Sequence, residues 1–274
     1  MKTVFKAAFL GFALFGLVAC GGDKAAPAGG GGGDKGGGDA KPAEPAEGGG
    51  GDAKQAYDAG KFKGSITGSV KFNGNVEARV LPIGGDSVCV GAWDGKKALD
   101  QDFEVNEDRT VPHALVYVSE GPHEGFTFTA PQDRGFTVDQ KNCYYDPHVF
   151  WVMAGEPFTV TNSDDTQHNV HIRPGRNDEE NKAQNTGGKD TFVFKKVEKK
   201  IVPFSCDVHS WMSAWCMVTD HPFVATTDDK GNFEITGLPP GEYTVKVWTK
   251  ALGKAEAKVT VADAEVKQDF ETAK

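Results

Sequence analysis

The chain has 274 residues and a formal net charge of −9. This acidic balance excludes nucleic-acid binding, because no basic stripe is present to neutralise phosphates. The length is sufficient for one large or two ordinary domains, even after the N-terminal segments, which cannot join a packed core, are set aside.

The first segment has the pattern of an export signal. Two lysines precede the apolar run 7–19, and small residues stand just before Cys20. The run is too short for a membrane-spanning helix. The pattern resembles the bacterial lipobox, which implies that residues 1–19 are removed and that Cys20 carries lipid. In such lipoproteins a glycine at the next position, here Gly21, implies transfer to the outer membrane. We therefore expect an exported, lipid-anchored protein that faces the periplasm, with an ordinary signal peptide and a chance cysteine as the alternative.

A glycine-rich stretch follows the signal. Residues 21–60 hold 15 of the 35 glycines, and Tyr57 is their first aromatic residue. Such a segment cannot bury enough apolar surface to offset its chain entropy. We predict that residues 20–60 form a disordered, flexible tether that gives the folded part reach from the membrane.

The remainder of the chain has the pattern of an all-β protein. Short alternating segments are separated by Gly, Pro, Asn and Asp, and a sustained 3.6-residue period is missing. The turn spacing is typical of β-sandwiches. The clearest predicted strands are 64–74, 113–121, 158–165, 168–175, 190–206, 231–248 and 255–263.

Two distant stretches complete one pattern. "GSITGSVKFNG" from residue 64 and "TTDDKGNFEITGLPPGEYTVKVW" ending at residue 248 together resemble the carboxypeptidase regulatory-like (transthyretin-like) β-sandwich. This resemblance implies a small β-sandwich split between residues 61–120 and 225–272, with residues 121–224 inserted as a second domain. The alternative is two domains in series, with residues 61–224 in one of them.

The insert contains a candidate metal site. "CDVHSWM" places a thiol, an imidazole and a thioether at even spacing, on Cys206, His209 and Met212, and "HNVH" upstream adds His168. Two imidazoles, a thiolate and a distant thioether form the donor set of copper electron-transfer sites. Zinc sites prefer Cys, His and carboxylate, so copper is the expected metal.

The two segments together resemble the cupredoxins, and the Cys-x2-His-x2-Met loop resembles that of amicyanin. This resemblance implies a Greek-key β-sandwich that binds one type 1 copper ion. His168, Cys206, His209 and Met212 match the four ligands. Asn169 matches the residue whose side chain ties the first ligand strand to the cysteine loop.

Two neighbours of the ligands have other expected roles. Residues three apart on a strand point to opposite faces, so His171 cannot share a metal with His168. Trp211 stands between His209 and Met212. We expect it on the surface beside an exposed imidazole edge, where it would help to dock a redox partner, and core filling is its alternative.

Three cysteines remain after lipid and copper are assigned. An exported protein reaches an oxidising compartment, where one disulfide is expected. Cys89 and Cys143 stand in polar, loop-flanked stretches and are the predicted pair, whereas Cys216 lies in an apolar run and is expected to be a buried thiol.

The predicted function is that of a membrane-anchored periplasmic blue-copper protein. It would transfer single electrons between redox partners, such as a cytochrome or a dehydrogenase or oxidase, and would not itself be an enzyme, although it could be a subunit of a larger oxidoreductase. The alternatives are copper binding or delivery without electron transfer, and a structural or polysaccharide-binding β-sandwich lipoprotein.

Overall fold

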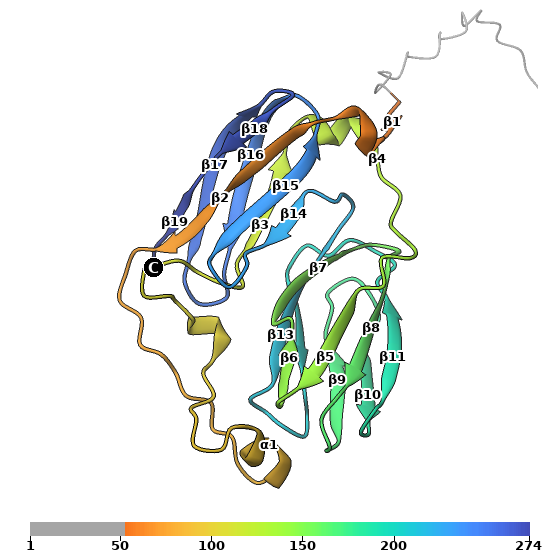
Figure 1. The fold of residues 1–274 in the computed structure, drawn as a ribbon. Helices are drawn as coiled ribbons and strands as arrows, with labels where there is room; N and C mark the ends of the chain where they lie inside the picture. Colours follow the sequence, from red (N-terminus) through yellow and green to blue (C-terminus); the bar gives the residue numbers. More distant parts are fainter. Residues whose placement is uncertain (1–52) are drawn as a thin grey trace, which may run out of the picture. The chain divides into compact units, whose positions relative to one another are not determined.

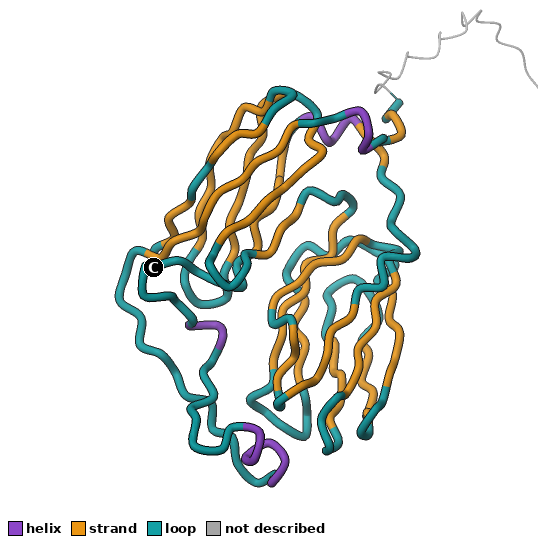
Figure 2. Tube along the Cα trace, viewed as in Figure 1, coloured by secondary structure: helices purple, strands orange, loops and turns teal. Residues whose placement is uncertain are grey.

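The computed structural model describes residues 53–274, and these residues form an all-β protein (Figure 1). The predicted signal peptide, Cys20 and most of the predicted tether lie outside the described residues. Helical structure within the described part is limited to α1 (Ser87–Ala92) and three short 3-10 helices (Figure 2). None of its helices has the length and apolar character needed to cross a membrane.

The first β-sandwich pairs an early strand with late ones. β2 (Gly64–Phe72) forms a sheet with strands from the C-terminal end of the chain, and the second sheet has the order β14-β3-β16-β17. The other strands are β3 (Leu115–Glu120), β14 (Val224–Thr226), β15 (Asn232–Leu238), β16 (Gly241–Trp248), β17 (Lys254–Val261), β18 (Glu265–Lys267) and β19 (Phe270–Thr272). Alternate residues of β2 and β16, including Ile66, Val70 and Val245, meet in one core between the two sheets.

The second β-sandwich consists of strands that lie between β3 and β14 in the sequence. Its sheets have the orders β10-β9-β12-β13-β7 and β11-β8-β5-β6 (Figure 1). The strands are β5 (Thr137–Lys141), β6 (Tyr144–Asp146), β7 (Val149–Met153), β8 (Pro157–Asn162), β9 (His168–Ile172), β10 (Glu180–Gln184), β11 (Lys189–Val193), β12 (Val202–Ser205) and β13 (Ser213–Thr219). Phe150, Phe158 and Phe204 fill the space between its sheets, with the rings of Phe150 and Phe204 centred 5.2 Å apart.

Two predicted strands are wrong. The sequence predicts one strand over 190–206 and one over 231–248, but the first stretch contains β11 and β12 and the second contains β15 and β16, and the two strands of each pair belong to different sheets. The eight residues between β11 and β12, "FKKVEKKI", include four lysines and a glutamate. This charged stretch carries the chain from one sheet to the other.

A long connection joins β2 to β3, and we call residues 73–114 the strap. It contains α1 and the 3-10 helix η2 (Gln101–Phe103). The sequence assigned it to the first sandwich, yet Cys89 is buried in the core of the second one, where Ile83 also packs. The reason is a disulfide that joins Cys89 to Cys143, in the turn between β5 and β6, with an S–S distance of 1.99 Å.

The folded part begins earlier than residue 61. β1 (Gln55–Ala56) pairs in parallel with β4 (Phe126–Thr127), and Tyr57 packs against aromatic rings while its hydroxyl donates to the Gly237 carbonyl oxygen at 2.7 Å. The boundary of the predicted tether at residue 60 is therefore placed too late. The burial of Tyr57, together with the pairing of β1, brings this segment into the fold.

Candidate metal centre

The ligand loop is the connection of a β-hairpin. β12 and β13 are antiparallel, and Ser205 pairs with Ser213, so the residues between them must turn tightly. The Cys206 N–H donates to the Met212 carbonyl oxygen at 3.3 Å, and the Met212 N–H donates to that of His209 at 2.9 Å. The His209 N–H points at the Cys206 sulfur, at 3.4 Å. These bonds hold the three candidate ligands of the loop on one short, closed turn.

The fourth candidate ligand comes from the neighbouring strand. β9 pairs with β12, and His168 is the first residue of β9. The Nδ1 atoms of His168 and His209 lie 2.8 Å apart. The Cys206 sulfur lies 4.0 Å from the first of these nitrogens and 3.9 Å from the second. The fold thus brings together three donor atoms from positions 168, 206 and 209.

These donors are closed off from solvent. His168, Cys206 and His209 have exposed fractions of 0%, 2% and 3%. Met212 is 1% exposed and lies in the same core. Within the described residues, this is the only group of three His, Cys, Asp or Glu side chains able to hold a metal that uses no disulfide sulfur.

Asn169 connects the ligand strand to the ligand loop. Its side-chain oxygen accepts a hydrogen bond from the Asp207 N–H, and its own N–H donates to the Cys206 sulfur at 3.4 Å. This is the contact that the cupredoxin resemblance implies. His171 lies on the other side of β9, where it pairs with Asp207 and Glu179, as strand alternation predicts.

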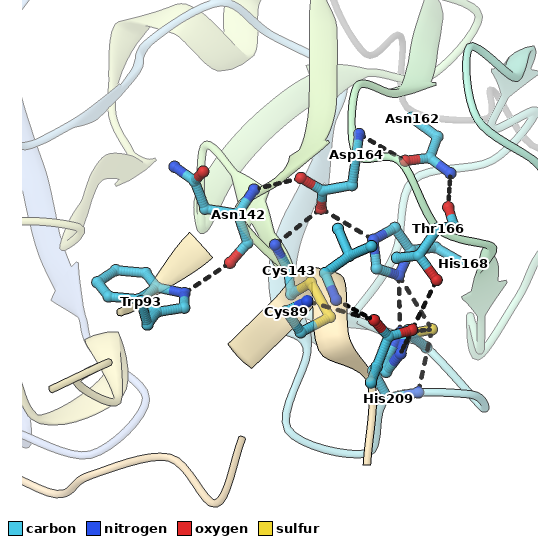
Figure 3. Close-up of a disulfide and its surroundings, with 12 residues drawn as sticks. Cys89, Trp93, Asn142, Cys143, Asn162, Asp164, Thr166, His168 and His209 are labelled. Carbon is cyan, nitrogen blue, oxygen red and sulfur yellow. Dashed lines mark hydrogen bonds and ion pairs between the residues drawn. A yellow bond between two sulfur atoms is a disulfide. The ribbon is translucent and has the colours of Figure 1, made fainter. Parts of the chain in front are cut away.

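A carboxylate lies at the remote nitrogen of each histidine. Asp164 is 2.9 Å from His168 Nε2, and it also accepts from the N–H groups of Asn142 and Cys143 (Figure 3). Asp86, on the strap, is 3.3 Å from His209 Nε2. Asp86 was not predicted from the sequence. The available signal was the predicted Cys89–Cys143 bridge, which brings the strap close to the turn beside β5.

The charges of the site follow from these contacts. Burial lowers the pKa of His168, but hydrogen bonds to Asp164 and Cys206 outweigh it and raise the pKa to about 9. Burial raises the pKa of the Cys206 thiol, and the bonds from His168 and from backbone N–H groups reverse this and lower it. Burial, followed by the charge of His168, lowers the pKa of His209. These shifts favour the thiolate of Cys206 and the unprotonated form of His209, which bind metals, and the protonated form of His168, which must lose a proton when a metal binds.

The position of Trp211 agrees only partly with the prediction. Its ring centre lies 5.0 Å from that of His209, but the side chain is half-buried against the second core and its Nε1 is buried without a partner in the described part of the chain. The expected exposed imidazole edge is wrong, because His209 is only 3% exposed and Asp86 lies at its Nε2. Cys216 is a buried free thiol.

Comparisons with known proteins give partial matches. Residues 195–268 match the model of polysaccharide lyase family 4, domain II, and this range includes strands of both sandwiches. Curated protein sequences give no match. The resemblance to carboxypeptidase regulatory-like sandwiches stays a prediction.

Solved structures similar to this chain include several cupredoxins. The M98A mutant of amicyanin with Cu(I) is 20% identical, with a TM-score of 0.28, and covers 32% of this chain and 85% of its own. A novel purple cupredoxin from Nitrosopumilus maritimus is 20% identical, with a TM-score of 0.27, and covers 31% of this chain and 99% of its own. The copper-containing nitrite reductase NirK from Thermus scotoductus SA-01 is 15% identical, with a TM-score of 0.30, and covers 38% of this chain and 28% of its own.

Proposed function

We propose that this chain binds one copper ion of type 1 at His168, Cys206, His209 and Met212 and carries single electrons between partners. The observation that supports this most is the convergence of two Nδ1 atoms and one sulfur within 4.0 Å of one another in a buried pocket. Two imidazoles, a thiolate and a loop methionine are the donors associated with copper electron-transfer centres.

The residues present fit copper better than zinc. Zinc sites take Cys, His or carboxylate as their fourth ligand. Here the carboxylates of Asp164 and Asp86 face the Nε2 atoms of the two histidines, whereas the Nδ1 atoms face the Cys206 sulfur. The loop supplies a buried thioether instead, on Met212. Soft sulfur donors with imidazoles select copper.

The role of the protein is to hold the donors and to exclude water. Copper bound here would supply one electron at a time by cycling between Cu(I) and Cu(II). The loop hydrogen bonds keep Cys206 and His209 in place, and Asn169 ties the strand of His168 to the same loop. The donors are at most 3% exposed, so a substrate has no open path to them from solvent, which favours a carrier over an enzyme.

The proposal extends to location and partners. Cys20 would anchor the chain to the outer membrane by lipid, and the glycine-rich segment would give the copper domain reach toward a periplasmic redox protein such as a cytochrome, dehydrogenase or oxidase. The half-buried Trp211, beside His209, would form part of the docking surface. The support for the anchor is the lipobox-like sequence that ends at Cys20.

The test is spectroscopic. The full chain loaded with Cu(II) should show an intense visible thiolate-to-copper charge-transfer band and the EPR signal of a type 1 site. Cys206→Ala should lose the band, and Cys216→Ala, which removes another buried thiol of the same core, should retain it. A colourless Cu(II) protein, or a band that survives Cys206→Ala, would refute the proposed site. A type 1 spectrum without electron exchange with any redox protein would favour copper delivery.

A further inference from the structure

The strap brings a carboxylate, that of Asp86, next to a candidate metal ligand that is distant in the sequence. Asp86 stands 123 residues before His209, and its Oδ2 lies 3.3 Å from the remote nitrogen of that imidazole. The strap leaves the first sandwich after β2, whereas all four candidate ligands belong to the second sandwich. Part of the environment of the centre is therefore contributed by a segment outside the strands that carry the ligands.

Asp86 is held firmly by both of its oxygens. Its Oδ1 accepts from the N–H groups of Val88 and Cys89 and so caps α1. Its Oδ2 accepts from the Thr166 hydroxyl at 2.6 Å and faces His209. Capping a helix uses only one oxygen. The contact with the imidazole is thus a second function of this side chain, separable from the cap.

The disulfide orients the two carboxylates that face the candidate histidine ligands, those of Asp86 and Asp164. The Cys89 N–H donates to Asp86, and the Cys143 N–H donates to Asp164. Figure 3 shows the bridge and Asp164, which accepts from the Cys143 N–H and faces the imidazole of His168. The Cys89–Cys143 bond therefore joins the two backbone segments that position the acceptors for His168 and His209.

We propose that Asp86 is a positioning residue for His209 and that the strap closes the copper site and lowers its reduction potential; this inference rests on the proposed function. A carboxylate that accepts from Nε2–H fixes the tautomer that directs the Nδ1 lone pair at the metal, and it makes the imidazole a stronger donor. A stronger donor stabilises Cu(II) more than Cu(I). His209 is only 3% exposed and Asp86 of the strap faces its Nε2, so a partner must reach the copper by a route other than this imidazole edge.

The variant Asp86→Asn separates the two functions. Asparagine is as good a helix cap as aspartate, so α1 should remain in place. The negative charge beside His209 is lost. Asp94→Asn is the matched control, because it makes the same charge change on the strap at an exposed side chain beyond the end of α1. Thr166→Val is a second variant, because it removes the hydroxyl that holds the Oδ2 atom of Asp86 and changes no residue of the strap.

The experiment measures three quantities on the full chain. These are the reduction potential, the Cu(II) and Cu(I) affinities by chelator competition, and the melting temperature without added copper. Loss of such an outer contact typically lowers metal affinity by about 10- to 100-fold. If Cu(II) binding weakens about tenfold relative to Cu(I) in Asp86→Asn, the potential rises by about 59 mV. Thr166→Val should shift it the same way by less, and Asp94→Asn should leave it unchanged.

The outcomes distinguish this inference from the proposed function. If Asp86→Asn and Thr166→Val both keep a type 1 spectrum with wild-type potentials and affinities, the proposed role of Asp86 is overturned. The proposed copper site would be unaffected by that result. A fall in melting temperature with no change in potential would assign Asp86 to helix capping alone and would also overturn it. A wild-type chain without a type 1 spectrum would remove both proposals.

Discussion

The disulfide between Cys89 and Cys143 should stabilise the second sandwich substantially against unfolding. It closes a loop with a sequence separation of 54. In the chain-entropy model a loop of this length removes about 14 cal/mol/K from the unfolded state, which is about 4 kcal/mol at 25 °C. Both half-cystines are fully buried, so the Cys89→Ala/Cys143→Ala double variant also loses some packing. We expect its free energy of unfolding to fall by about 3–5 kcal/mol.

The assay is urea unfolding followed by tryptophan fluorescence under non-reducing conditions. Cys216→Ala is the control, because it removes a buried sulfur from the same core and breaks no cross-link. Reduction of the wild-type protein should reproduce the double variant, whereas Cys216→Ala under non-reducing conditions should show only its own small loss. A double variant within about 1 kcal/mol of the control would show that the bridge does not restrict the unfolded chain, contrary to the entropic account.

Three further predictions concern other contacts. Asn169→Ala removes the acceptor that ties β9 to the cysteine loop, so copper affinity measured by chelator competition should fall about 10- to 100-fold, and an unchanged affinity would contradict this coupling. Burial and a neighbouring histidine lower the pKa of His221 to about 4. The unfolded chain, with a pKa of about 6.5, then binds the extra proton first, so stability is full above pH 6.5 and falls by up to about 3 kcal/mol as the pH drops to 4. His221→Gln should flatten this slope in urea titrations, and an equally steep slope would assign it to other groups. Gly231→Ala should lose more stability than Gly187→Ala: both glycines have positive φ, of 75° and 72°, but a Cβ at Gly231 would lie 2.7 Å from a side chain of the strap, whereas Gly187 has open space. We expect losses of about 2–5 and about 1 kcal/mol in thermal unfolding, and equal losses would refute the steric reasoning.

Local patterns predicted much of the fold and part of the site. Alternation along 64–74 and 255–263 predicted strands because one face of each is buried and the other is not. His168 could be found because it follows a polar turn and opens a strand that pairs with the strand before Cys206. The donor types of the loop then indicated the metal.

Contacts between distant segments could not be predicted in the same way. Asp86 has the sequence pattern of a helix cap, and nothing near it in the chain indicates the imidazole that it faces 123 residues later. The strap has few alternating apolar residues, so its docking on the second core depends on one disulfide and on a few side chains such as Ile83. The contact between Asp86 and His209 follows from this docking and not from the ligand loop itself.

The placement of β2 also determines the order in which the protein can be assembled. Its strand partners, β15, β18 and β19, begin at Asn232, so β2 emerges from the ribosome without them and waits until nearly the whole chain has been made. All strands of the second sandwich are complete by Thr219 and can fold first. The first sandwich closes last, by long-range pairing of the kind that folds slowly. An unpaired β2 is an open sheet edge during this interval, so the nascent chain is most exposed to aggregation before its final forty residues arrive.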